Sequence, residues 1–457
     1  MPNQNSLTST EGYSETIRKM LSKKGINVGD RISVNGKNEG ILMPRISGDR
    51  DILILKLDNG YNIGIKPDLV KKISGVTKTK DKAWLIDKKH DPSKPTIVIL
   101  HTGGTIASKL DYRTGAVNPA ITDDELLAMY PELSEIANIQ SRIVFQMFSE
   151  DMETAHWSAI AKKIESEISA GCDGVIVTHG TDTMYYTASA MSFALQNLPI
   201  PVIFVASQRS SDRPSSDAGI NLMSAALFIA QGDFAGVGTC MHSSPSDEKC
   251  FILEANRCRK MHTSRRDTYR PINFKPLAEV EWEARTVKFL RGDYNKKDRK
   301  KKLQLKAKFS DKVGFLKIYP GFPQELVDVF SKKYEGLVLE GYAFGQLPIN
   351  SLDKATEHHS KLLEKLSILA KKIPVIIVSQ VPYGVMNMNV YSTSRDIVNA
   401  GVIPAYMQSY SAYVKLCWLL GNGIQLKEIR EEFNKDLAGE VFSRQEVDEF
   451  PDNAMER

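Results

Sequence analysis

The sequence predicts an α/β fold in which helices cover a parallel sheet, with a small antiparallel β-barrel before it. Short strands of alternating polarity follow one another in the N-terminal part of the chain. Apolar strands then alternate with helical patterns, which is typical of a parallel sheet covered on both faces. The composition agrees, because 457 residues with 42% hydrophobic and 25% charged residues exclude a mainly disordered chain.

The N-terminal strands are short and separated by turn signals. A polar stretch with a helical pattern, residues 13–21, precedes them. Residues 28–34 alternate in polarity, and Asp58-Asn59-Gly60 is a hairpin turn signal between two further strands. We therefore predict a small barrel over residues 26–75, within an accessory domain and linker over 1–92, and find no chemistry in it.

A regular alternation of strands and helices begins at Pro95 and predicts an α/β domain over residues 93–292. Its predicted strands are 96–100, 174–178 and 201–206, and its predicted helices are 151–170, 187–195 and 218–230. The alternation returns in a smaller C-terminal α/β domain over residues 311–457. The predicted strands of that domain are 313–318, 336–340 and 374–379.

A basic stretch, residues 293–310, joins the two α/β domains. Its cations are Lys296, Lys297, Arg299, Lys300, Lys301, Lys302, Lys306 and Lys308. The stretch is either a solvated linker or a surface that contacts RNA phosphates, since clustered cations bind RNA by releasing counterions. The whole chain carries a net charge of only +5, which does not indicate a nucleic-acid-binding protein.

The sequence shows no pattern of a membrane, secreted or metal-binding protein. No apolar run is long enough for a membrane helix, and no secretory signal is visible. His101 and His179 lack further clustered ligands, so we expect both to be structural and expect no metal site. The cysteines predict reduced thiols in the cytoplasm, with one disulfide as the alternative. They are Cys172, Cys240, Cys250, Cys258 and Cys417.

Two polar turns directly follow consecutive predicted strands. The first is His101-Thr-Gly-Gly-Thr-Ile-Ala-Ser108, and the second is Thr178-His-Gly-Thr-Asp-Thr-Met184. In an open parallel sheet, ligands bind in the crevice beyond the carboxyl ends of the strands. If the two strands are neighbours, both turns direct hydroxyls and a carboxylate into one site.

The residue types in these turns suit nucleophilic chemistry. A threonine hydroxyl such as that of Thr102 reacts only if a base takes its proton. Asp182, beside Thr181, or a buried lysine with a tuned pKa can provide that base or carry the proton. The amide of Gly103 can stabilise an oxyanion. A tight turn or a phosphate-binding loop is the alternative for the first turn, although no Gly-Lys-Ser/Thr follows it.

The two turns resemble the two signature motifs of the bacterial-type L-asparaginase family. The resemblance covers about residues 95–425, and further blocks follow in the order of the family. These blocks are Ser207-Gln-Arg, Ser216-Asp-Ala-Gly-Ile-Asn-Leu, Gln380-Val, Gly384, Tyr391 and Ala400-Gly-Val-Ile-Pro. The resemblance implies an asparaginase-like two-domain fold after the barrel and an amidohydrolase reaction.

The resemblance also implies a role for each matching residue. Thr102 matches the nucleophile of the family. Thr181 and Asp182 match the threonine and aspartate that bind the substrate and complete the proton network. Lys260 matches the catalytic lysine, although the arginines around it leave a surface cation as the alternative. Tyr112 matches a tyrosine that assists the nucleophile from a mobile loop, and the polar loop 108–117 suits such a lid.

Two further matches concern substrate binding. Ser149 matches a residue that contacts the α-carboxylate of the substrate. Glu150 stands where asparaginases commonly carry glutamine beside the α-amino group. A carboxylate there can still pair with the ammonium group, but the difference departs from the family pattern.

Within the family, the extra barrel and the segment 257–267 resemble one branch, the archaeal-type glutamyl-tRNA(Gln) amidotransferase D subunits. The resemblance implies a cytoplasmic subunit that hydrolyses glutamine through a threonine acyl-enzyme and releases ammonia. A partner, the E subunit, would use ATP and Mg²⁺ to activate glutamate on tRNA(Gln), bind the tRNA mainly by itself, and add the ammonia. The resemblance further implies a homodimer within a heterotetramer, no cofactor in this chain and no membrane contact.

Two other functions are compatible with these residues. A stand-alone cytoplasmic L-asparaginase would prefer asparagine and need no partner. A non-catalytic tRNA-binding scaffold would use the basic stretch, but it would not need to keep Thr102, Thr181, Asp182 and Lys260.

Overall fold

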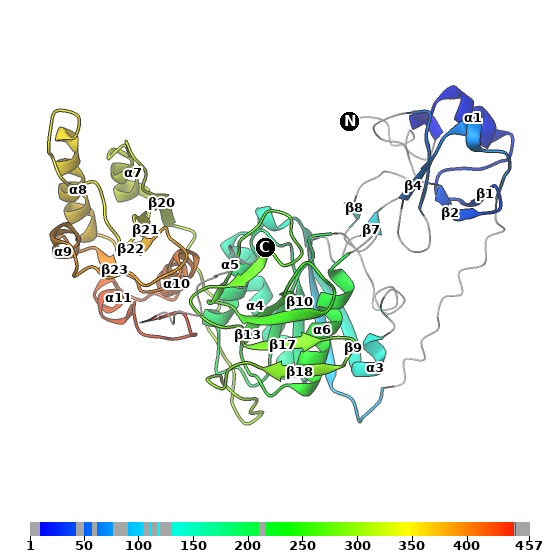
Figure 1. Cartoon of the computed structure of the whole chain (residues 1–457). Helices are drawn as coiled ribbons and strands as arrows, with labels where there is room; N and C mark the ends of the chain where they lie inside the picture. The colour runs from blue at the N-terminus through cyan, green and yellow to red at the C-terminus, as the bar shows by residue number, and fades with distance from the viewer. Residues whose placement is uncertain are drawn as a thin grey trace.

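The computed structural model describes residues 10–42, 50–56, 62–75, 90–104, 109–110, 117–118, 130, 132–209, 216–442 and 444. Figure 1 shows three groups of elements: an N-terminal group, a central group around the largest sheet, and a C-terminal group. The hairpin turn predicted at 58–60 and most of the loop 108–117, including Tyr112, lie outside the described residues. No helix within these ranges is both long and apolar enough to cross a membrane.

The N-terminal group is a helix packed on a five-stranded antiparallel sheet. Helix α1 (Glu15–Ser22) begins where the Ser14 hydroxyl accepts a hydrogen bond from the Ile17 amide, which caps an otherwise free N–H group. Ile17 and Leu21 of the helix pack on the apolar side chains of the sheet. In sheet order, the strands are β4 (Asn62–Ile65), β3 (Leu53–Lys56), β2 (Asn38–Leu42), β1 (Arg31–Val34) and β5 (Ile73–Gly75).

The central group is built on an eight-stranded mixed sheet (Figure 1). Its parallel part consists of β9 (Asn138–Met147), β6 (Thr96–Gly103), β10 (Gly174–Thr178), β12 (Val202–Val205) and β13 (Val237–His242). The sheet continues antiparallel with β14 (Lys249–Glu254), β17 (Ala278–Glu281) and β18 (Thr286–Phe289). This antiparallel part was not predicted from the sequence. The connection from β13 to β14 is too short for a crossover helix, so the chain returns as a hairpin.

Three helices cover the two faces of this sheet. Trp157 of α4 (Thr154–Ser169) and Met191 of α5 (Met184–Ala194) lie in the core on one face, and Leu222 of α6 (Ala218–Gln231) lies in the core on the other. Helix α5 starts before the predicted Thr187, because Met184 is itself buried against the sheet. A further helix among the described residues is α3 (Leu133–Ile136). Short ribbons pair β7 (Lys109–Leu110) with β8 (Val117–Asn118), β11 (Leu195–Gln196) with β19 (Gln304–Leu305), and β15 (Cys258–Lys260) with β16 (Tyr269–Pro271).

The C-terminal group contains a four-stranded parallel sheet. Its order is β20 (Val313–Lys317), β21 (Gly336–Gly341), β22 (Val375–Ser379) and β23 (Ile403–Pro404). Helix α10 (Ser409–Gly421) packs on both β21 and α5, so the C-terminal and central sheets share one apolar core. The helices are α7 (Leu326–Lys333), α8 (Ser360–Ala370), α9 (Ser392–Asn399), α10 (Ser409–Gly421) and α11 (Leu426–Glu432).

A buried ion pair attaches the segment after α11 to α10. Lys415 and Glu440 are both fully buried, with Nζ 2.5 Å from Oε1. The Lys415 ammonium also donates a 2.6 Å hydrogen bond to the carbonyl oxygen of Lys435. The Glu440 carboxylate accepts hydrogen bonds from the amides of Leu437 and Ala438. Burial lowers the pKa of Lys415 and raises that of Glu440, while the attraction between the two opposes both shifts.

We expect Glu440→Gln to destabilise the fold by about 3 kcal/mol, because it leaves a buried ammonium without a counter-charge. The matched control is Glu432→Gln, which removes an exposed ion pair with Lys435 and should change stability little. Thermal and urea unfolding of the two full-length variants measures the difference. Equal unfolding midpoints would contradict this role of the buried pair.

Candidate active site

The first glycine-rich turn closes the carboxyl end of β6. Thr102 is buried, and its Oγ1 donates a 2.8 Å hydrogen bond to the carbonyl oxygen of Thr178, at the end of the neighbouring β10. Gly103 and Gly104 adopt positive φ angles of 115° and 79°. A Cβ atom on Gly104 would lie 2.6 Å from the amide nitrogen of Gly180, so only glycine fits there. The two turns are therefore packed directly against each other.

The second turn brings Thr181 and Asp182 to Lys260. The Nζ atom of Lys260 lies 2.8 Å from Oγ1 of Thr181 and 2.8 Å from Oδ1 of Asp182. The lysine side chain is 13% exposed, whereas that of Asp182 is 64% exposed. Asp182 and Lys260 also line a cavity of about 400 Å³, together with Tyr185, Arg259, Met261, His262 and Thr263. Lys260 is thus a largely buried ammonium held by both residues rather than a free surface cation.

A short ribbon carries Lys260 to this place. Lys260 ends β15 and lies opposite Tyr269 of β16. Tyr269 is fully buried, and its hydroxyl donates a 2.7 Å hydrogen bond to the carbonyl oxygen of Thr181. Tyr269 was not predicted from the sequence, and no motif separates it from the other tyrosines of the chain. Both strands of the ribbon therefore contact the second turn.

Ser149 and Glu150 follow β9 in a 3₁₀ turn (Ser149–Asp151). Ser149 is buried against the second turn, because a Cβ atom on Gly180 would lie 2.6 Å from its Oγ. The Thr183 hydroxyl donates a 2.6 Å hydrogen bond to the carbonyl oxygen of Ser149, a contact that was not predicted from the sequence. Glu150 is exposed. The structure thus joins Ser149 to the second turn and places Glu150 at the adjacent surface.

His101 and His179, which precede the turn residues, are hydrogen-bonded to neighbouring groups of the fold. His101 is buried, with Nδ1 2.9 Å from Oγ1 of Thr178 and Nε2 3.0 Å from Oγ of Ser141. His179 is buried, and its Nδ1 donates a 2.8 Å hydrogen bond to the carbonyl oxygen of Gly180. Burial lowers the pKa of His179 to about 4, so the ring is neutral at physiological pH. These contacts favour the structural role that we expect for both rings.

The block that begins at Ser207 shapes the end of β12. The Asp217 carboxylate is fully buried and accepts hydrogen bonds from the amides of Gln208 and Arg209, at 2.9 and 3.0 Å. Asn221, one turn further along α6, donates a 2.9 Å hydrogen bond to the carbonyl oxygen of Ala206. Because β12 pairs with β10, this block forms the part of the sheet edge next to the second turn.

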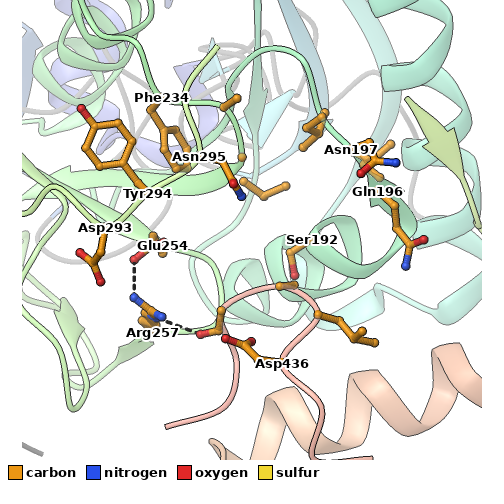
Figure 2. Close-up of a pocket in the computed structure, with 18 of the residues that line it drawn as sticks. Ser192, Gln196, Asn197, Phe234, Glu254, Arg257, Asp293, Tyr294, Asn295 and Asp436 are labelled. Atoms are coloured by element: carbon orange, nitrogen blue, oxygen red, sulfur yellow. Dashed lines mark hydrogen bonds and ion pairs between the residues drawn. The ribbon is translucent and has the colours of Figure 1, made fainter. Parts of the chain in front are cut away.

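A larger cavity, of about 830 Å³, lies at the opposite edge of the sheet (Figure 2). Its lining includes Val237, the first residue of β13, and Glu254, the last residue of the antiparallel β14. Figure 2 shows Arg257 beside Glu254, and the two pair at 3.0 Å. Arg257 also donates a 2.8 Å hydrogen bond to the carbonyl oxygen of Gly439. Of the described residues that are predicted to be catalytic, none lines this cavity.

The basic stretch crosses the same region, where Lys301 lines the cavity. Several of its cations are bound within the central group. Lys296 lies 3.0 Å from Asp233, Arg299 pairs with Asp173, and Lys297 donates to the carbonyl oxygen of Ile229. These contacts suit a structured linker, and the contact with RNA stays a prediction.

Three family models match the chain. The model "Asparaginase, N-terminal" matches residues 96–293, and "Glutaminase/Asparaginase C-terminal domain" matches residues 312–433. The model "GatD N-terminal domain" matches residues 26–76, the region of the five-stranded sheet.

Curated relatives match almost the whole chain. The D subunit of glutamyl-tRNA(Gln) amidotransferase from Pyrococcus furiosus is 42% identical over 441 residues, which are 93% of this chain and 97% of the relative. The D subunit from Methanobrevibacter smithii is 40% identical, covering 96% of this chain and 99% of the relative. That from Thermofilum pendens is 39% identical, covering 97% and 99%.

Solved structures with a similar fold include two asparaginases. The thermostable L-asparaginase from Thermococcus kodakarensis is 29% identical, with a TM-score of 0.66 over 76% of this chain and 99% of that one. L-asparaginase I from Vibrio cholerae is 26% identical, with a TM-score of 0.64 over 77% of this chain and 100% of that one.

Proposed function

Because this chain belongs to the asparaginase-related family of glutamyl-tRNA(Gln) amidotransferase D subunits, we propose that it hydrolyses glutamine to supply ammonia for tRNA-dependent amidation. One observation carries the proposal: the Lys260 ammonium lies 2.8 Å from both Thr181 and Asp182, in the turn packed against that of Thr102. A threonine hydroxyl becomes a nucleophile when groups that accept and hold its proton stand close by.

The proposed reaction is a double displacement at Thr102. Its Oγ1 attacks the side-chain amide carbon of glutamine, and the proton passes into the network around Lys260. Thr181 relays the proton to Lys260, which reacts as the neutral amine, and Asp182 stabilises the ammonium that forms. The ammonium then returns the proton to the departing nitrogen. The Gly103 amide donates to the oxyanion of the tetrahedral intermediate. The C–N bond then breaks, the protonated nitrogen leaves as ammonia, and water hydrolyses the remaining ester to glutamate.

Substrate binding is assigned to groups around the second turn. The buried Ser149 hydroxyl receives the α-carboxylate of glutamine. The α-ammonium group pairs with Glu150, whose exposed carboxylate needs no rearrangement of the core to reach it. We propose that Tyr112 assists the nucleophile from the loop 108–117 when that loop closes over bound glutamine.

The ammonia is used by a second protein in this proposal. An E subunit activates the γ-carboxylate of glutamate on tRNA(Gln) with ATP and Mg²⁺, holds most of the tRNA, and adds the ammonia. This chain itself needs no cofactor, works in the cytoplasm, and forms a homodimer within a heterotetramer. A protein of this kind should hydrolyse little glutamine when idle, so we expect its activity to depend on the partner and tRNA.

A stand-alone L-asparaginase is the second candidate, favoured by the structural similarity to asparaginases over 76% and 77% of the chain. The measurement that separates the two is kcat/KM for glutamine and for asparagine. It is made on the purified chain alone and with the E subunit, ATP and charged tRNA. We expect low glutamine turnover alone and a rise of at least about tenfold with partner and tRNA. Fast asparagine hydrolysis at a rate that the E subunit does not change would contradict our proposal and support the stand-alone asparaginase.

A further inference from the structure

The segment that follows the candidate catalytic lysine is held mainly by its own hydrogen bonds and by arginines. The amide of Met261 donates a 2.8 Å hydrogen bond to the carbonyl oxygen of Thr268. The amides of Ser264 and Arg265 both donate to Nδ1 of His262, at 3.1 Å. These contacts fold residues 261–268 into a compact loop, but they do not attach it to the rest of the molecule.

One arginine of this loop and one of the adjacent strand β16 attach it to the connection between β13 and β14. Arg266 pairs with the Asp247 carboxylate and donates to the carbonyl oxygen of Pro245. Arg270, on β16, donates a 2.8 Å hydrogen bond to the carbonyl oxygen of Ser243. The ribbon that carries Lys260 is therefore anchored on residues 243–248.

That connection is anchored in turn on a buried histidine. The His242 ring is fully buried, with Nε2 3.2 Å from Oδ1 of Asp247 and Nδ1 2.6 Å from Oδ1 of Asn221. The Asn221 side chain turns its oxygen toward the ring, because its Nδ2 nitrogen donates hydrogen bonds to the carbonyl oxygen of Ala206 and to the carboxylate of Asp217. Both ring nitrogens thus face oxygen acceptors, and only the imidazolium form has a proton for each of them.

The surroundings of His242 favour this charged form. Burial opposes it, but the hydrogen bond and charge of Cys250, followed by the carboxylates of Asp247 and Asp217, outweigh burial and raise the pKa of His242. A histidine whose pKa is raised by folding stabilises the fold fully below about pH 6.5, and this contribution is lost as the pH rises through the raised value. The titratable and charged groups around the ring are Asp217, Cys240, Asp247, Cys250 and Arg266, with Tyr130 beside Asp217.

We propose that Asp217, Asn221, His242, Asp247 and Arg266 form a charged relay that positions Lys260, and that the proton on His242 makes this positioning sensitive to pH. The relay deepens the proposed glutaminase function and rests on it. Its members are positioning residues, since they act through Lys260. When His242 loses a proton, the shorter 2.6 Å contact with Asn221 keeps the remaining proton on Nδ1. Nε2 then presents a lone pair to the Asp247 carboxylate, and the anchor of Arg266 loosens. A shift of 1 Å at a catalytic group is enough to lower a rate about a hundredfold.

The experiment compares Asp247→Asn with Glu248→Gln in the full-length chain, under the condition that supports glutamine turnover. Both substitutions remove one negative charge from the same exposed connection, but no described contact joins Glu248 to His242. For Asp247→Asn we expect kcat to fall about tenfold. We also expect the alkaline decline of kcat to move to lower pH, because the His242 proton is held less firmly. For Glu248→Gln we expect the wild-type profile.

Arg266 gives a second test from the other end of the relay, in case Asp247→Asn does not fold. Arg266→Lys keeps the charge opposite Asp247 and should retain most of the activity, whereas Arg266→Gln should lose about tenfold. A purely structural role would change the fraction of folded protein and its dependence on pH, but kcat per folded molecule would keep the wild-type pH profile. Equal kcat and pH profiles for Asp247→Asn and Glu248→Gln, or for the two Arg266 variants, would overturn the relay. A wild-type chain that never hydrolyses glutamine would instead refute the proposed function.

Discussion

A chain in which Thr102 is replaced by valine is expected to hydrolyse glutamine at least about 10³-fold more slowly than the wild type. Valine keeps the branched shape but has no oxygen that could form the acyl-enzyme. The fold should survive, because the lost group makes one hydrogen bond, to the carbonyl oxygen of Thr178, worth about 1 kcal/mol. Ammonia release and thermal unfolding of the same preparation measure the two effects.

The matched control for this variant is Thr187→Val. Thr187 is also a buried threonine, and its hydroxyl accepts a 3.2 Å hydrogen bond from Nε1 of Trp157 and donates a long one, 3.4 Å, to the carbonyl oxygen of Thr183. It lies outside the two turns, so its removal should leave glutamine hydrolysis close to the wild-type rate. Near-normal turnover by Thr102→Val would show that Thr102 is not the nucleophile, whatever the control shows.

The second large effect is expected at Lys260. Lys260→Met removes both polar contacts of the ammonium, with Thr181 and with Asp182. We expect kcat to fall about 10²- to 10⁴-fold, the usual effect of losing a positioned acid or base. Lys260→Arg keeps the positive charge, but a guanidinium does not give up its proton. The arginine variant should therefore be almost as inactive as the methionine variant.

Lys249→Met serves as the control for a lost lysine. Lys249 lies on β14, 40% exposed and 3.8 Å from Glu279, and no described contact joins its side chain to either turn. Its variant should hydrolyse glutamine as the wild type does. If Lys260→Arg were fully active, the lysine would act through its charge alone and the proton-transfer step would be wrong. If Lys260→Met were active as well, Lys260 would have no part in the chemistry.

Strands and turns of the central group were predictable from local patterns. The predicted strands at 96–100, 174–178 and 201–206 lie in the parallel part of the sheet as β6, β10 and β12. A strand that is apolar on both sides must be covered on both faces of its sheet. Such a strand can be recognised from a few consecutive residues. The two turns follow these strands directly, so their meeting at one edge of the sheet could be expected as well.

The role predicted for Lys260 follows from the family resemblance and not from a local pattern. It lies 79 residues from Thr181 and 78 residues from Asp182, whose side chains it contacts. Several arginines surround it in the sequence, and nothing in their spacing singles out one cation. The contact exists because β15 pairs with β16 and Tyr269 reaches the second turn.

Length, composition and local periodicity therefore establish an α/β chain with an N-terminal strand-rich region and a polar site at the carboxyl ends of β6 and β10. They do not establish the antiparallel part of the central sheet, the contact of Tyr269 with Thr181, or the contact of His242 with Asn221. Those features join side chains that are far apart in the sequence. They depend on which strands pair and in which register, and a one-residue shift in register would turn each side chain to the other face.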